Sequence, residues 1–401
     1  MKTQIFNCIT IIGLISVLLS CEKEEILVSG INLSETNVVL SVDSAITLIA
    51  EIEPLDASDK TLNWNSSDNR IAQVSSDGII SGISPGTATI TVESNNGLLK
   101  SCSVAIFQII EHDPIDEIDF GASPFMAFDR SDNLWYGGYG GLYKMGFDGS
   151  GWQFFPLNTE VNAFDFDSKN NLWVASHSMG LLKFDGQTWY TYDTSNSEIP
   201  TNCVTSVGID NNDRIWMGLS NNNRYYQNKV ASFNGVEWSI YQSEECLVKD
   251  YSVFDIKVDH RNNIWVAHYN GVSMFDGSVW SSIISDNNLA GSNVLGVDED
   301  NESNIWFITS PYGVFKYNGT NTINYNTKNS SISSNNIQSV MVDEKDNIWI
   351  GRTGGVSKFD EEEWINLSYR DFHLFDIRAS AIDSKGNKWF ASPTKIYELK
   401  D

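Results

Sequence analysis

The chain is 401 residues long, and its 52 acidic and 26 basic side chains give a formal net charge of −26 at neutral pH. This excess of negative charge argues against nucleic acid and anionic membrane surfaces as partners, because both would repel the protein. The five cysteines include no Cys-x-x-Cys pair and the five histidines show no paired metal spacing. We therefore predict neither a metal site nor a cofactor.

Residues 1–20 have the features of a signal peptide, since Lys2 is followed by an apolar run from Ile9 to Leu19 that is too short to be a comfortable membrane span. The sequence Leu-Leu-Ser-Cys that ends at Cys21 resembles a bacterial lipobox, which implies cleavage before Cys21 and lipidation of that residue. The acidic residues that follow look like the tether of surface-displayed Bacteroidota lipoproteins, so we expect residues 21–28 to be a tether.

These features predict an outer membrane lipoprotein, on the cell surface or the periplasmic face, that meets the membrane only through its lipid anchor. An ordinary secretory signal with a chance cysteine is the alternative.

Residues 29–107 predict a separate all-β unit. Short alternating segments lie at 38–42, 46–52, 88–92 and 102–107, and turn residues such as Pro54 and Asp77-Gly78 separate them. The run from Asn63 to Val92 resembles the bacterial immunoglobulin-like (Ig-like) domain of group 2. This resemblance implies a β-sandwich that serves as a spacer or adhesion module and holds no active site.

Residues 108–121 are interpreted as a linker, and residues 122–401 contain seven copies of a unit of about 42 residues. Each copy has a tryptophan with an aspartate six residues earlier, and six copies have an asparagine two residues before the tryptophan. The tryptophans are Trp135, Trp173, Trp216, Trp265, Trp306, Trp349 and Trp389, and the aspartates are Asp129, Asp167, Asp210, Asp259, Asp300, Asp343 and Asp383.

Such a period predicts blades of four short antiparallel strands that bury their faces against one another. The predicted fold is all-β, a seven-bladed β-propeller preceded by an Ig-like β-sandwich. We expect each repeated aspartate to end the first strand by accepting a backbone N–H two residues on. The periodic tryptophans are interpreted as packing between blades rather than as a ligand platform.

The seventh copy ends at Asp401 after a third strand, Ile396 to Leu399, and lacks a fourth. Because Ile115 to Phe120 alternates like a strand, we expect this part of the linker to supply the fourth strand and close the ring.

The repeated pattern DxxxNxWxG, GxxxFDG and a further tryptophan resembles the two-component regulator propeller repeat. This repeat occurs in the extracytoplasmic sensor part of hybrid two-component systems and in stand-alone lipoproteins of Bacteroidota. The resemblance implies perception of oligosaccharides. It does not extend to direct signal transduction, since the 401 residues include no kinase and no second propeller.

Recognition is expected on the face formed by the loops that differ from blade to blade. The candidate ligand-binding residues are Tyr136, Tyr139, His177, Arg224, Tyr225, Tyr226, His268, Tyr269, Tyr312 and Arg352, whose side chains can stack on a sugar and hydrogen-bond to its hydroxyls. The predicted function is a binding protein for an oligosaccharide or an envelope protein, and binding is favoured over catalysis. A polysaccharide lyase or hydrolase and a structural subunit of an envelope complex are the alternatives, and no catalytic residue is nominated.

Three cysteines remain outside the predicted signal and lipobox. Cys203 and Cys246 precede neighbouring blades and are conceivable as a disulfide in an exported protein, but buried free thiols account for them equally well.

Overall fold

The computed structural model describes residues 25–112, 124–147, 151–220, 229–242, 244–248, 253–269, 271–283, 293–368 and 372–401. The predicted signal peptide, Cys21, the segment Ile115 to Phe120 and the candidates Arg224, Tyr225 and Tyr226 lie outside these residues. Within the described residues, no helix is long and apolar enough to cross a membrane.

The N-terminal domain is a small β-sandwich. β1 (Gly30–Leu33) pairs with β4 (Ala50–Glu53), and β3 (Ala45–Thr47), β7 (Ile79–Gly82) and β6 (Ala72–Val74) form a second sheet. The third contains β5 (Leu62–Ser66), β8 (Gly86–Ser94) and β9 (Leu99–His112), with β2 (Asn37–Ser41) parallel to β9. The single strand predicted at 46–52 is therefore two strands, which belong to different sheets.

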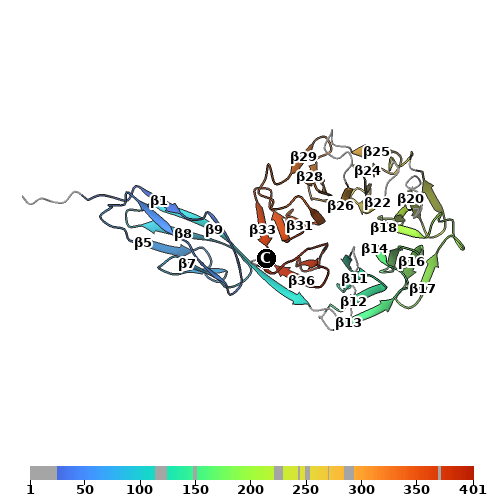
Figure 1. The fold of residues 1–401 in the computed structure, drawn as a ribbon, viewed down its shortest axis with the longest axis horizontal. Coiled ribbons are helices and arrows are strands. Elements are labelled where there is room, and N and C mark those ends of the chain that lie inside the picture. The colour runs from blue at the N-terminus through green and yellow to red at the C-terminus, as the bar shows by residue number, and fades with distance from the viewer. Residues whose placement is uncertain are drawn as a thin grey trace, which may run out of the picture.

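The rest of the chain forms a ring of seven antiparallel sheets (Figure 1), which confirms the predicted propeller. Blade 1 contains β10 (Phe125–Phe128), β11 (Leu134–Gly138), β12 (Gly141–Met145) and β13 (Trp152–Pro156). Blade 2 contains β14 (Val161–Phe166), β15 (Leu172–Ser176), β16 (Leu181–Phe184) and β17 (Trp189–Tyr192). Blade 3 contains β18 (Cys203–Ile209), β19 (Ile215–Ser220), β20 (Lys229–Phe233) and β21 (Trp238–Tyr241).

Blades 4 to 7 contain β22 (Val253–Val258), β23 (Ile264–His268), β24 (Gly271–Phe275), β25 (Trp280–Ile283); β26 (Asn293–Glu299), β27 (Ile305–Ser310), β28 (Gly313–Tyr317), β29 (Thr322–Tyr325); β30 (Ile337–Val342), β31 (Ile348–Arg352), β32 (Gly355–Phe359), β33 (Trp364–Ser368); and β34 (Ala379–Ile382), β35 (Lys388–Ala391) and β36 (Ile396–Lys400). We number the strands of a blade from first, at the centre of the ring, to fourth.

The fourth strand of blade 7 is the C-terminal part of β9. It pairs antiparallel with β36, from His112 opposite Ile396 to Gln108 opposite Lys400. Closure by the N-terminal part of the chain was predicted, but its location at Ile115 to Phe120 was wrong. One continuous strand serves both domains, since residues 99–106 of β9 pair with β8 in the sandwich. Figure 1 shows β9 running from the sandwich into the ring.

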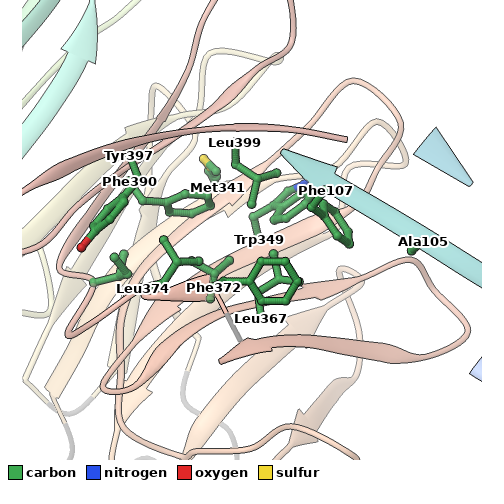
Figure 2. Packing of buried hydrophobic residues seen from close by; sticks show 12 residues of the cluster. Ala105, Phe107, Met341, Trp349, Leu367, Phe372, Leu374, Phe390, Tyr397 and Leu399 are labelled. Atoms are coloured by element: carbon green, nitrogen blue, oxygen red, sulfur yellow. The ribbon is translucent and has the colours of Figure 1, made fainter. Parts of the chain in front are cut away.

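Phe107 lies where β9 passes between the domains and is buried in the ring rather than in the sandwich. Its ring meets those of Trp349 and Phe372 edge to face, each at a centroid distance of 6.3 Å. Figure 2 shows these side chains together with Leu399 of blade 7. The sandwich is thus joined to blades 6 and 7 through a shared apolar core.

The repeated aspartates organise each blade, and we call them the turn aspartates. In all seven blades the tryptophan Nε1 donates to Oδ2 of the turn aspartate, at 2.8 to 3.1 Å. Oδ1 accepts the backbone N–H two residues on, as from Ser131 to Asp129 at 2.9 Å, which confirms the predicted turn. Although burial alone would raise it, these hydrogen bonds hold the pKa of Asp129 below its ordinary value.

Neighbouring blades are also joined turn to turn. In this bond, the residue that follows one turn aspartate donates its backbone N–H to a side chain in the next blade. The acceptor is the residue three positions after that blade's turn aspartate. Asn301, which follows Asp300, thus donates to Asp346 at 2.7 Å. The same bond joins Arg130 to Asn170, Ser168 to Asp213, Asn211 to Asn262 and Ser384 to Asp132. Between blades 4 and 5, His260 donates to Glu299 instead.

Candidate functional site

The centre of the ring holds a cavity of about 600 Å³, lined by residues of the first strand of every blade. This volume lies within the range of pockets that hold small ligands, roughly 300–1,000 Å³. In blades 2 to 6 the first strand has a bulge near its start, as between Val253 and Asp255. The bulges set which side chains face the cavity.

We define the channel mouth as the residues five positions before each turn aspartate. They lie near the start of the first strands, toward the loops that enter these strands, and no two are alike. They are Pro124, Asn162, Thr205, Phe254, Leu295, Gln338 and Arg378, and all except Thr205 line the cavity.

The polar side chains of the channel mouth differ in how firmly they are held. Arg378 donates from Nε and Nη2 to Oδ2 of Asp376, at 3.0 and 2.7 Å. The Asn162 amide donates to the Val204 carbonyl at 2.6 Å, whereas the Gln338 amide makes a longer bond of 3.4 Å to Asn336. The Gln338 amide is therefore the mouth group that can most readily exchange its partner for a ligand.

Deeper in the cavity lie three carboxylates and one ammonium group. Each carboxylate accepts a backbone N–H from the next blade: Asp165 from Ile209 at 3.0 Å, Asp255 from Val297 at 3.0 Å and Asp298 from Val342 at 2.8 Å. The Lys257 ammonium lies 2.7 Å from Asp298. These acids hold blades together, and the lysine offsets part of their charge.

The pKa values of this cluster follow from its position. Burial raises the pKa of Asp165 to about 6, against the opposing effect of N–H donors from Phe166 and Ile209. Burial also raises the pKa of Asp255, and the charge of Asp298 raises that of Lys257. Because both oxygens of Asp165 already accept backbone N–H groups, they are poorly placed for acid–base chemistry on a ligand.

Three predicted site residues are buried in second strands and not in loops. Tyr136, His268 and Arg352 belong to β11, β23 and β31 and are 0%, 3% and 4% exposed. Arg352 donates from Nε to Ser357 at 2.9 Å, and His268 Nε2 lies 3.1 Å from the hydroxyl of Ser273. Burial lowers the pKa of His268, and lowers that of Arg352 to about 10. Their prediction as loop residues was wrong.

Four other candidates lie at the surface, each between the second and third strands of a different blade. Tyr139 and Tyr312 are 61% and 43% exposed, His177 is exposed and Tyr269 is half-buried. None of the seven described candidates lines the central cavity. The structure therefore spreads the described candidates around one face, and the channel mouth is a feature that they do not include.

The described residues contain no group of three or more His, Cys, Asp or Glu side chains that could hold a metal ion. Cys203 and Cys246 are both buried free thiols, so the disulfide that the sequence left open does not form. Burial raises the pKa of each thiol, which makes both unreactive.

Residues 27–104 match the family model described as bacterial Ig-like domain (group 2). The chain is 32% identical over 111 residues to an uncharacterized protein of Clostridium acetobutylicum. The matched region covers 26% of this chain and 12% of that protein. The chain is also 35% identical over 74 residues to an alpha-L-arabinofuranosidase of Bifidobacterium longum, or 18% of this chain and 7% of that enzyme. The chain thus spans only about a tenth of the length of these relatives.

Among solved structures, the chain is similar to a streptogramin B lyase, with a TM-score of 0.60, 13% identity and coverage of 73% of this chain and 97% of the lyase. It is also similar to YCF48 bound to D1 peptide, with a TM-score of 0.54, 11% identity and coverage of 74% and 97%. For the extracellular domain assigned to a hybrid two-component system of B. thetaiotaomicron, the TM-score is 0.37, with 18% identity and coverage of 77% and 47%. At these identities the likeness shows the fold alone.

The fold and the match to the family model together define the class of protein. It is an all-β protein in which a bacterial Ig-like domain of group 2 is joined to a seven-bladed β-propeller.

Proposed function

We propose that this protein is a lipid-anchored, non-enzymatic binding protein of the cell envelope, on the surface or periplasmic face of the outer membrane, and that its propeller binds a glycan at the channel mouth. The observation that carries the proposal is the contrast between repeated and unrepeated residues. Asp and Trp recur in every blade, whereas the seven mouth positions all differ, over a cavity of about 600 Å³. Loops and strand ends on a rigid scaffold are a common location for recognition.

The mouth, together with the exposed segment just before Arg378, offers the two kinds of contact that a sugar uses. Phe254 lines the cavity, and Phe375, three residues before Arg378, is 56% exposed. Such aromatic faces can stack on a pyranose ring. The Gln338 amide and the Arg378 guanidinium can donate to hydroxyl oxygens. The exposed Tyr139, His177 and Tyr312 would extend the contact for a longer chain.

The charge of the cavity restricts the ligand. Asp165, Asp255 and Asp298 outnumber Lys257, and Asp376 already pairs with Arg378. The whole chain is also strongly acidic. A neutral glycan therefore fits better than a sulfated or uronic acid polymer, which the negative field would repel.

The hydrogen bonds that these carboxylates already make favour binding over lyase or hydrolase chemistry. Each already accepts a backbone N–H of the next blade, and Asp298 also bonds Lys257. A general acid or base needs an oxygen within reach of the substrate.

A glycan array with the protein from residue 22 onward tests the proposal. We expect retention of neutral oligosaccharides without any change in their mass. Release of shortened or unsaturated sugars would replace binding by catalysis. If folded protein retains no glycan and an envelope protein co-purifies with it, the ligand is a protein partner instead.

A further inference from the structure

Two junctions of the ring, that of blades 4 and 5 and that of blades 6 and 7, lack the turn-to-turn bond to the third residue after the turn aspartate, and at the first of them His260 donates to Glu299 instead. The residue three positions after a turn aspartate accepts this bond in blades 1, 2, 3, 4 and 6, but in blade 7 this residue is Gly386, which has no side chain. The N–H of Glu344 in blade 6 therefore cannot be bound there in the same way. We call the junction of blades 6 and 7 the seam.

Phe107 enters the propeller at the seam. Its apolar cluster contains Met341 and Trp349 from blade 6 and Phe390 and Leu399 from blade 7. Phe107 itself is 2% exposed. Burying an aromatic ring of this size contributes substantially to the packing of both blades. A side chain of the strand shared with the Ig-like domain thus bridges the two blades of the seam.

An ion pair crosses the seam, and two further pairs lie within blade 7, between the closing strand and the C-terminal residues. Lys388 occupies a position that is Leu or Ile in the other six blades, and its Nζ lies 3.4 Å from Asp343 of blade 6 and 2.5 Å from Asp401. On the closing strand, Glu111 pairs with Lys395 and His112 contacts Glu398 at 3.2 Å. A hydrogen bond of 3.0 Å from Asn37 to Glu363 links the sandwich directly to blade 6.

We propose that the Ig-like domain is the clamp that closes the propeller, and that opening of the ring at the seam is controlled by Phe107 and residues 108–112. The domain then has a second role besides that of a spacer, because its strand β9 holds the ends of the ring together. The clamp does not depend on which ligand the propeller binds, so it is tested without any ligand.

The test is hydrogen exchange of the full chain, wild type against Phe107→Ala. We expect exchange to become at least tenfold faster in β34, β36 and β31, and to stay unchanged in β15 and β19 on the other side of the ring. If Phe107→Ala does not yield folded protein, Phe107→Leu gives the same comparison with a smaller loss of packing.

Phe315→Ala is the matched control, since Phe315 is 1% exposed and stacks on Phe307 within blade 5. It should speed exchange in β27 and β28 and leave β36 protected. Introducing Gly386→Asn into Phe107→Ala should slow exchange in β34 again, by supplying the missing turn acceptor. The clamp would be refuted if Phe107→Ala sped exchange only in β2 and β8 while β36 kept its wild-type rate.

Discussion

The indole Nε1 of Trp306 donates to Oδ2 of Asp300 at 2.8 Å, across six residues of one blade. Asp300 is 4% exposed and also accepts backbone N–H groups from Glu302 and Asn304, at 3.1 and 2.8 Å. One buried carboxylate thus ties the first turn, the second strand and the tryptophan of its blade together, and the same arrangement holds all seven blades.

Replacement of this carboxylate should be severe. Asp300→Ala leaves the Trp306 indole buried without its acceptor and leaves the Asn304 amide only its long bond of 3.4 Å to Glu302, so we expect a loss of about 3–5 kcal/mol in the free energy of unfolding. Urea unfolding followed by tryptophan fluorescence measures it. Asp276→Ala is the control, because Asp276 makes similar turn bonds at an exposed position, and its loss should be much smaller. Equal losses for the two variants would contradict a special role of the buried site.

Gly386→Asn should stabilise the ring. Gly386 has φ of +81° and no atom within 4 Å of a Cβ added there. Asp132, Asn170 and Asp346 hold the same turn position with φ of 62 to 63°. Asparagine tolerates this conformation and would supply an acceptor for the Glu344 N–H, so we expect a gain of about 0.5–1.5 kcal/mol by chemical denaturation.

Gly386→Ala separates the two contributions to that gain. It adds a side chain at the same φ but offers no acceptor, and should destabilise the protein by about 1 kcal/mol. A gain in stability for both variants would show that the turn bond is not the cause.

Asp165 should make stability depend on pH in a defined direction. Its pKa is raised to about 6, above the ordinary value of about 3.9 in an unfolded chain. The folded state therefore binds the proton more tightly, and this group's contribution to stability falls as pH rises from about 4 to about 6 and is constant above that. The whole change is at most about 3 kcal/mol.

Asp165→Asn removes this titration while keeping one acceptor oxygen. The melting temperature of the variant relative to wild type should therefore rise between pH 4.5 and pH 7.5. Lys257 and Arg130, the charged groups that lower the Asp165 pKa, are the same in both proteins. A difference that does not change with pH would contradict a raised pKa.

The lipid anchor is tested by Cys21→Ser. In the native host, wild-type protein should incorporate labelled palmitate and partition into detergent, whereas the variant should do neither. Cys203→Ser is the control, because Cys203 is a buried thiol, and it should keep the label. Retention of the label by Cys21→Ser would contradict the predicted anchor.

The fold could be predicted because one buried arrangement recurs seven times, so that each copy supports the interpretation of the others. The exact closing strand could not. Residues 108–112 continue β9 without a turn residue and carry no sign that the pairing partner changes from β8 to β36. Strand pairing over nearly 300 residues leaves no local trace in the sequence.

The candidate site was predicted only in part, for two physical reasons. His268 and Arg352 are the last residues of second strands, where a difference of one residue decides between a buried position and an exposed turn, and Tyr136 lies in the middle of such a strand. The cavity carboxylates were missed because the chain has 52 acidic residues and nothing in the sequence sets these three apart. Asp255 lies four residues before its turn aspartate and Asp298 two, so both occupy the same face of their first strands and line the cavity.

The most direct test of the proposed function is the affinity of the double variant Gln338→Ala/Phe254→Ala for a glycan that the wild type retains, measured by calorimetry. Tyr190→Ala, a 45% exposed side chain on the fourth strand of blade 2, is the control. Binding at the channel mouth predicts at least a tenfold loss of affinity for the double variant and none for the control. Unchanged affinity of a folded double variant would contradict recognition at the channel mouth.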